Sequence, residues 1–364
     1  MTARWVVLEP LDTVSIRDGR GFDMGLDAAA RSALPSPATF AGAIGALYDP
    51  TPGLARKDPG APGTRLPSQV HGPITVRRTS GRWEALLPVP HDVVVSGGKP
   101  LRLVAEKGDA PVQHDLDEDV ALLLADPGGD STPGEGHWWD ADQLSQYLHD
   151  GEVDDFLRFA PWQIERRVGI AREADRTVTE GMFYSTEHLR LAPGVGFAGR
   201  CVGGPQRKLD GTVPFGGEGR RAEVHGDVPD IGLPPMPADF PGGRLLLYLV
   251  TPAVFPGGSW RPDLGSLPGG HGEGPLSEAE LVAAAVGTTR VVTTGSPDRR
   301  SGAFGAGWLM WAVPAGAVYY LKFPDEAAAR AAAARVHGTT IRQAEDWMRT
   351  AGFGLVLTGR WTEG

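Results

Sequence analysis

The sequence predicts an α+β fold with two ferredoxin-like β-α-β-β-α-β domains, loop insertions and a protruding β-hairpin. The second half alternates apolar strand-like runs with helix-like segments in that order, and the first half carries a weaker copy. In the middle of the chain, residues 159–201 contain two strand-like runs joined by a polar, arginine-rich connection. We therefore expect a first domain over residues 1–240, with helical and hairpin insertions, and a second over residues 241–364.

The composition favours a loop-rich protein of the reduced cytoplasm. The 51 glycines and 32 prolines form no repeat, and the lone cysteine, Cys201, cannot form an internal disulfide. No apolar run approaches the roughly 18 residues of a membrane helix, and the N-terminus lacks the pattern of a secretory signal. The net charge of −10 argues against a free-standing nucleic-acid binder. It permits a subunit that has one local basic face and acidic faces toward protein neighbours.

Local signals place the elements of the first half. Ser36 can cap a helix that has Pro37 at its first position and apolar residues at helical spacing. The pair Trp138 and Trp139 predicts core packing, with base stacking as the alternative. The expected elements are a strand at 4–9, a helix at 37–48, a loop at 51–68, a hairpin of 73–79 and 82–90, an apolar segment at 120–126, and a helix from about 140 to 149.

The same signals place the remaining elements. A polar connection at 171–181 predicts a hairpin of strands 165–170 and 182–191. Ser277 as a cap, with Glu280 in the capping-box position, predicts a helix. The other expected elements are a glycine turn and strand within 213–225, a strand at 244–251, the capped helix at 277–286, strands at 289–294 and 317–323, a helix at 325–338, helical character at 340–348, and a last strand within 352–361.

The N-terminal strand, a basic glycine loop and a helix start together suit phosphate groups. Arg17 and Arg20 can supply forked donors, and Ser36 and Thr39 lie where backbone N–H groups and the helix dipole attract anions. The alternative is an ordinary β–loop–α unit with solvated arginines. Asp12 with Asp18 could also hold Mg²⁺ beside a phosphate, although Asp18 is more simply explained as a brace for a neighbouring arginine.

The central hairpin is a second candidate site. Its alternating arginines can straddle a strand of RNA, while a threonine and a tyrosine can add hydrogen bonds or stacking; these residues are Arg166, Arg167, Arg172, Arg176, Thr177 and Tyr184. The alternative is a solvated, charged hairpin. Two glycine segments, around Gly217 with Arg220 and at Gly352 with Gly354, let the backbone approach a ligand or adopt unusual torsions.

Ordered motifs along the chain resemble one protein family, the third subunit of the Cmr effector complex of type III-B CRISPR–Cas systems, in the repeat-associated mysterious protein (RAMP) superfamily. The specific motifs are PLDT with RDGRGF within 10–22, PSPATFAGA at 35–43 and RVGI with TVTEGMFYSTEHLRL within 167–191. The weaker ones are FGGEGRR at 215–221, LVTPAVF at 249–255 and GFGLVLTG at 352–359. Gly21 departs from the family, which usually has proline there.

The resemblance implies domains built around a groove that holds RNA. It implies a non-catalytic subunit of an antiviral CRISPR interference complex that grips the repeat-derived 5′ tag of the CRISPR RNA. It further implies contacts with the large cyclase-bearing subunit and the backbone RAMP subunits, an indirect contact with target RNA, and no cofactor, metal or membrane. The residues expected to contact RNA are Arg17, Arg20, Ser36, Thr39, Arg166, Arg167, Gly169, Arg172, Arg176, Thr177, Tyr184, Gly217, Arg220, Gly352 and Gly354.

Two other functions stay open. Some RAMP relatives cleave RNA, and His188 with Tyr184 is the best acid–base pair for an endoribonuclease that processes CRISPR precursors. The sequence has no HExxH, CxxC, GxSxG or P-loop motif, so neither a zinc site nor a familiar hydrolase motif is indicated. The third possibility is a purely architectural subunit whose basic loops meet acidic partner surfaces.

Overall fold

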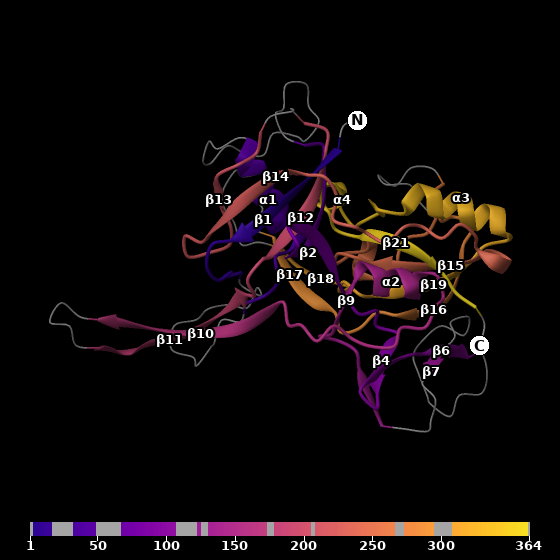
Figure 1. The fold of residues 1–364 in the computed structure, drawn as a ribbon, viewed down its shortest axis with the longest axis horizontal. Coiled ribbons are helices and arrows are strands. Elements are labelled where there is room, and N and C mark those ends of the chain that lie inside the picture. Colours follow the sequence, from indigo (N-terminus) through magenta and orange to yellow (C-terminus); the bar gives the residue numbers. More distant parts are fainter. Residues whose placement is uncertain are drawn as a thin grey trace.

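The structure is a computed structural model. It describes residues 3–16, 32–48, 67–106, 122–124, 130–172, 178–204, 208–265, 273–294 and 308–362. These residues form a mixed α/β fold with many strands and few helices (Figure 1). None of the described helices is long and apolar enough to span a membrane.

The first half builds a seven-stranded sheet in which every neighbouring pair is antiparallel. Its strands, in spatial order, are β13 (Thr212–Pro214), β14 (Arg221–Val228), β1 (Ala3–Pro10), β12 (Val195–Val202), β2 (Gln69–Thr79), β3 (Arg82–Pro88) and β9 (Trp138–Asp140). The chain after β14 returns to β3, where the Ala85 N–H donates to Ile231 O at 2.9 Å. The sheet therefore curls, and Trp83 of β3 lies 5.3 Å, between ring centroids, from His225 of β14.

The helix and hairpin signals of the first half are confirmed. α1 (Pro37–Tyr48) begins after Ser36, whose Oγ accepts a hydrogen bond from the Thr39 N–H at 3.2 Å. Strands β2 and β3 meet at Ser80 and Gly81, which both have positive φ, as a tight hairpin turn requires. α2 (Ala141–Leu148) has Asp140 as its N-cap within a capping box.

The second half builds a five-stranded antiparallel sheet. Its strands, in spatial order, are β16 (Glu280–Ala285), β19 (Val318–Lys322), β15 (Arg244–Leu249), β21 (Leu355–Arg360) and β20 (Thr339–Thr340). α3 (Glu326–Val336) follows β19, and α4 (Asp346–Ala351) precedes β21. The predicted strands at 244–251, 317–323 and 352–361 and the helix at 325–338 are thus confirmed to within a few residues.

Two helix predictions in this half are wrong. Residues 277–286 contain strand β16, because pairing with β19 buries Leu281 and Val282 in two different cores and outweighs a weak helical preference. Only the end of the 340–348 segment is helical. The chain before α4 is held by Val254, whose N–H donates to Gln343 Oε1 at 2.7 Å and whose carbonyl accepts from the Ala344 N–H.

Within the described part of the second half, the expected β-α-β-β-α-β order therefore lacks its first helix. Between β15 and β16, the described residues include one short 3₁₀ turn, η2 (Pro256–Gly258), and no α-helix. A further 3₁₀ turn, η1 (Pro241–Gly243), precedes β15.

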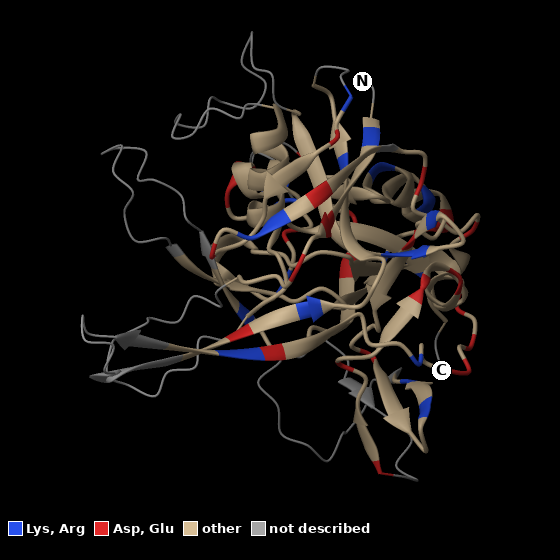
Figure 2. Ribbon diagram, turned by 60° about the vertical axis from the view of Figure 1, so that its left-hand side comes forward, with Lys and Arg blue, Asp and Glu red and all other residues tan. Residues whose placement is uncertain are grey.

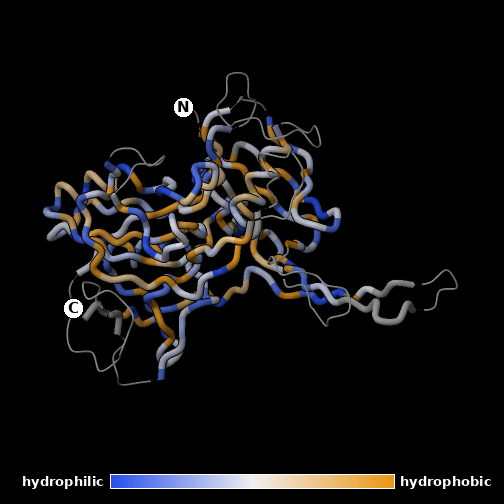
Figure 3. The backbone as a smooth tube through the Cα atoms, turned by 180° about the vertical axis from the view of Figure 1, so that it is seen from behind, coloured by the Kyte–Doolittle hydropathy of each residue, from blue (hydrophilic) through white to orange (hydrophobic). Residues whose placement is uncertain are grey.

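The protruding hairpin predicted from the sequence is present. β10 (Trp162–Arg172) and β11 (Val178–Leu191) pair antiparallel and project from the body (Figures 1 and 3). The smaller sheets comprise β17 (Arg290–Thr294) with β18 (Trp308–Ala312), β4 (Val93–Ser96) with β5 (Lys99–Arg102) and β8 (Ser131–Pro133), and β6 (Val104–Glu106) with β7 (Leu122–Leu124).

The two large sheets share a hydrophobic core. One cluster of buried side chains joins Val7, Ile74 and Leu87 of the first sheet with Tyr248 and Leu357 of the second. Figure 3 shows orange, hydrophobic stretches passing through this part of the body. The strands of the two sheets come from opposite sides of residue 240, but the division into two domains at that residue stays a prediction.

Candidate nucleic-acid interface

Three of the sequence motifs meet at the carboxylate of Asp12. Arg167 Nη2 lies 3.3 Å from Asp12 Oδ2, and Arg190 Nη2 lies 3.1 Å from Asp12 Oδ1; both arginines are at the base of the projecting hairpin. Arg220, in the glycine turn before β14, makes a third ion pair with Asp12 Oδ2. We use the name Asp12 cluster for Asp12, Glu165, Arg167, Arg190, Glu218 and Arg220.

Backbone pairing brings these motifs together. Val14 and Leu189 exchange two N–H···O bonds of 2.8 and 2.9 Å, which fix the chain after β1 to the base of β11. Ser15 O accepts from the Gly217 N–H at 2.7 Å, which fixes the same chain to the glycine turn. The hairpin register places Glu165 opposite His188, so both project from the same face as Arg167.

Glu165 supplies a second carboxylate to the cluster. It accepts from Arg167 Nε at 2.8 Å and forms a close ion pair with Arg190 Nε. These bonds from Arg190 and Arg167 lower the pKa of Glu165 to about 2. For Asp12, desolvation opposes ionisation, but the bonds from Arg167 and the nearby Arg220 and Arg190 hold its pKa below the usual value. Both carboxylates are therefore ionised at neutral pH.

The Asp12 cluster balances its charges internally. Its three arginines face three carboxylates, the last being Glu218 at 3.9 Å from Arg220 Nη2. Figure 2 shows basic and acidic segments alternating along the hairpin. By contrast, the Arg166 side chain is 77% exposed, on the other face of β10, with Glu187 Oε1 3.4 Å from its Nε. The cluster is thus suited to bracing the hairpin, and Arg166 to meeting an external anion.

His188 is buried beneath the cluster. Its Nδ1 lies 2.9 Å from Thr13 Oγ1, and its Nε2 lies 3.2 Å from Glu218 Oε2. Burial lowers its pKa below the usual value, against the opposing effect of Glu218. The register puts the backbone of Tyr184 opposite Gly169, four residues along the strand from His188, or about 13 Å in an extended chain. This arrangement gives no support to an acid–base pair of His188 and Tyr184.

Ser36 and Thr39 line a cavity of about 370 Å³ that lies against β2 and β3 of the first sheet and against β17. The other walls include Trp138 and Trp162, whose rings meet edge to face with centroids 5.1 Å apart. Trp139 is almost fully buried and packs on Tyr147, so the core role predicted for the tryptophan pair is supported.

The C-terminal glycines serve packing in this structure. Gly352 has φ of +106°, and a Cβ atom there would lie 2.4 Å from Gly72 O, so only glycine fits against β2. Its N–H donates to Met348 O at 3.1 Å, and the Gly354 N–H donates to Pro252 O at 2.9 Å. The Gly217 N–H is likewise bonded to Ser15 O, so these three N–H groups are not left to donate to RNA, while the fourth expected glycine, Gly169, lies on the hairpin opposite Tyr184.

Several predicted contacts cannot be placed. Arg17, Asp18, Arg20, Arg176 and Thr177 lie outside the described residues, as do the side chains of Arg172 and Tyr184. Sequence reasoning missed Arg190 and missed Asp12 as the shared partner of three arginines. Arg190 lies two residues after His188 on β11, and this spacing places both side chains on one face of the hairpin. The residues that they face on β10 depend on the hairpin register, which shifts at a bulge between Ile170 and Arg172 and cannot be read from the sequence.

Of the comparisons with known proteins, the one with family models shows the family of this chain. A search of the curated proteins found no match. A cryo-EM structure of the type III-B Cmr-beta complex bound to cognate target RNA and AMPPnP contains a similar chain, with a TM-score of 0.48, 16% identity, and coverage of 87% of this chain and 86% of that one. A second, bound to cognate target RNA, gives a TM-score of 0.47 with the same identity and coverage. The model of the family described as CRISPR-associated protein (Cas_Cmr3) matches residues 6–361, and this chain therefore belongs to the Cas_Cmr3 family.

Proposed function

We propose that this chain is a non-catalytic subunit of a type III-B CRISPR effector complex, in which it holds the 5′ repeat-derived tag of the CRISPR RNA. Membership of the Cas_Cmr3 family supports the CRISPR role. The observation that carries the RNA role is a projecting hairpin whose base is fixed by the Asp12 cluster while Arg166 remains exposed beside it.

A braced hairpin suits RNA binding for a physical reason. β10 has 11 residues and reaches roughly 36 Å when extended, so without a fixed base its tip would sweep a large volume. Ion pairs from two separate elements to one carboxylate reduce that freedom before RNA arrives. Less entropy is then lost on binding, as in other pre-organised interfaces.

The proposal also assigns the partners. The acidic surface implied by a net charge of −10 is suited to protein neighbours rather than to RNA alone. We propose that the large cyclase-bearing subunit and the backbone RAMP subunits are those neighbours. We also propose that this chain contacts target RNA only indirectly, through these subunits. The burial of His188 beneath the Asp12 cluster supports a non-catalytic role.

The finer fold assignment belongs to the same proposal. The antiparallel strand order β16-β19-β15-β21, with α3 between β19 and β21, supports a ferredoxin-like origin for the second half. We propose that the first half has the same origin, with its sheet extended by β12 and β14.

RNA crosslinking with mass spectrometry, on the complex purified through this subunit, tests the function. Crosslinks from the 5′ tag to residues 162–172 and to the first forty residues are expected. Arg166→Ala should weaken tag binding and reduce its salt slope by about one unit, because one phosphate contact is lost. Arg158→Ala is the matched control, since that side chain is 91% exposed outside the hairpin.

The internal charge balance of the Asp12 cluster favours one second candidate, an architectural subunit. A guide-loaded complex with no crosslinks to these segments, and with equal tag binding by both variants, would support that role and reject the RNA role.

A further inference from the structure

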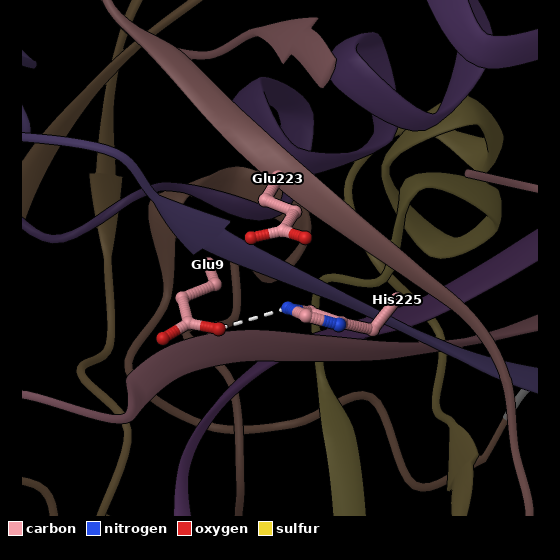
Figure 4. Close-up of side chains that lie close together, drawn as sticks. All are labelled: Glu9, Glu223 and His225. Atoms are coloured by element: carbon pink, nitrogen blue, oxygen red, sulfur yellow. Dashed lines mark hydrogen bonds and ion pairs between the residues drawn. The ribbon is translucent and has the colours of Figure 1, made fainter. Parts of the chain in front are cut away.

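We propose that Glu9, Glu223 and His225 form a binding site for a first-row divalent metal ion such as Zn²⁺. Glu9 lies on β1, and the other two residues lie on the neighbouring strand β14 (Figure 4). One potential ligand atom from each side chain lies within 4.8 Å of the other two. Among the described residues, no other group of three or more His, Cys, Asp or Glu side chains comes so close.

The strand register creates this convergence. Glu9 lies directly opposite Glu223, and Val7 lies opposite His225, so the carboxylates and the imidazole share one face of the sheet. Like charges directly opposite each other destabilise a strand pair. In the part of the chain that the structure describes, no hydrogen bond engages the Glu223 carboxylate. Its neighbour Arg221 is bound instead to Thr212 Oγ1 at 2.8 Å. Among the described residues, the one ion-pair partner of the two glutamates is His225, and neither glutamate is paired with a lysine or an arginine.

Two of the potential ligands already lie side by side. His225 Nε2 lies 2.8 Å from Glu9 Oε2, and both side chains are about three-quarters buried. The Trp83 ring, tilted by 51° against the imidazole, supports His225 from the side of the core. Ligand atoms about 2.1 Å from a tetrahedral Zn²⁺ are about 3.4 Å apart, so His225 Nε2 and Glu9 Oε2 must separate by about 0.6 Å when a metal ion replaces their hydrogen bond. Glu223 is exposed and has no described partner, so no described interaction holds its carboxylate away from the other two ligands.

The donor set identifies the class of metal. One imidazole nitrogen with two carboxylates suits Zn²⁺ and similar ions, whereas Mg²⁺ and Ca²⁺ prefer all-oxygen sites. Three protein ligands leave a coordination position for water. A metal ion bound here would link β1 to β14 near the end of β1, shortly before the chain reaches Asp12. The absence of HExxH and CxxC motifs is no obstacle, because more than two hundred residues separate Glu9 from the other ligands.

Titration of ZnCl₂ alone tests the site. The full chain, without a histidine tag and stripped with EDTA, is titrated in phosphate-free buffer by isothermal calorimetry, and its thermal unfolding is followed with and without Zn²⁺. We expect one saturable site per chain and a higher melting temperature with Zn²⁺. Glu223→Gln should weaken binding at least tenfold and remove the thermal shift.

Glu278→Gln is the matched control, because Glu278 is also exposed and lies far from the site in sequence. It should bind Zn²⁺ as the unmodified chain does. His225→Gln should abolish Zn²⁺ binding. If that variant fails to fold, the comparison of Glu223→Gln with the unmodified chain still decides, because Glu223 is exposed and its substitution should not disturb folding. Absence of a saturable site, or equal affinity in Glu223→Gln and the unmodified chain, would overturn the proposal.

Discussion

At the residue scale, the Asp12 carboxylate accepts contacts from three guanidinium groups that come from the hairpin base and from the glycine turn. It therefore connects the hairpin base and the glycine turn to the chain that follows β1. Arg167 Nη2 contacts the carboxylates of both Asp12 and Glu165, and these two contacts fix the orientation of its planar guanidinium group.

Asp12→Asn should loosen the hairpin without unfolding the protein. The amide keeps the shape but leaves three arginines against two carboxylates, so repulsion acts at the hairpin base. Half-exposed ion pairs add little to global stability, so the melting temperature should change little. Hydrogen exchange at Val14 and Leu189 should become several-fold faster. Asp210→Asn, which breaks an exposed pair with Lys208, is the control, and equal exchange in both variants would contradict the bracing role.

Gly352→Ala should be among the most damaging small substitutions in the chain. The new Cβ would lie 2.4 Å from Gly72 O and 2.5 Å from Val70 O, both rigid backbone atoms. We expect a loss of at least 3 kcal/mol of unfolding free energy, or failure to fold. Gly338→Ala has the same type of positive φ, with nothing within 4 Å, and should cost only about 1 kcal/mol. Chemical denaturation of both variants measures the difference in unfolding free energy. Equal losses in the two variants would show that the positive φ, and not the close backbone atoms, sets the cost of the substitution.

At the element scale, local signals were sufficient wherever an element is stabilised by its own residues. The cap and the apolar stripe of the 37–48 helix lie within the thirteen residues from Ser36 to Tyr48, and the Ser80-Gly81 turn is specified by two positions. Strand β16 was missed because its stability comes from β19, nearly forty residues later. The Asp12 cluster and the Glu9–Glu223–His225 group were missed for the same reason, since strand register cannot be derived from either strand alone.

A buried polar network joins three elements and shows the same dependence on distant residues. Asp92, fully buried before β4, accepts from the Tyr147 hydroxyl of α2 at 2.7 Å and from the Tyr320 hydroxyl of β19 at 2.5 Å. Arg102 Nε lies 3.3 Å from the same carboxylate. Burial raises the pKa of both tyrosines, which keeps them protonated as donors.

Asp92→Ala should lower the free energy of unfolding by about 3 to 5 kcal/mol, because it leaves two buried hydroxyls without their acceptor and Arg102 with Asp150 as its remaining carboxylate partner. Tyr320→Phe removes one donor and should cost about 1 kcal/mol. Urea denaturation followed by tryptophan fluorescence compares the two variants. If Asp92→Ala were no more destabilising than Tyr320→Phe, the network would not hold α2 to the second sheet.

At the scale of the whole molecule, the two large sheets depend on each other. Tyr248 of the second sheet is fully buried, and its hydroxyl donates to Pro88 O at 2.7 Å, at the end of β3 in the first. Gly352 packs on β2, and Leu246, Tyr248 and Leu357 lie in the same core as Val7 and Ile74. The boundary near residue 240 thus separates strands in sequence, while the packed core continues across it.

This shared core predicts one cooperative unfolding transition for the whole chain. Differential scanning calorimetry should give a single peak whose calorimetric and van't Hoff enthalpies agree. A fragment of residues 241–364 would expose Leu246, Tyr248 and Leu357 to water, at a cost of about 1.5 to 3 kcal/mol for each large side chain. With typical domain stabilities of about 5 to 15 kcal/mol, that fragment should remain unfolded by circular dichroism. Two separate transitions, or a folded fragment, would instead establish the independent domains that the sequence predicts, because each sheet would then carry its own sufficient core.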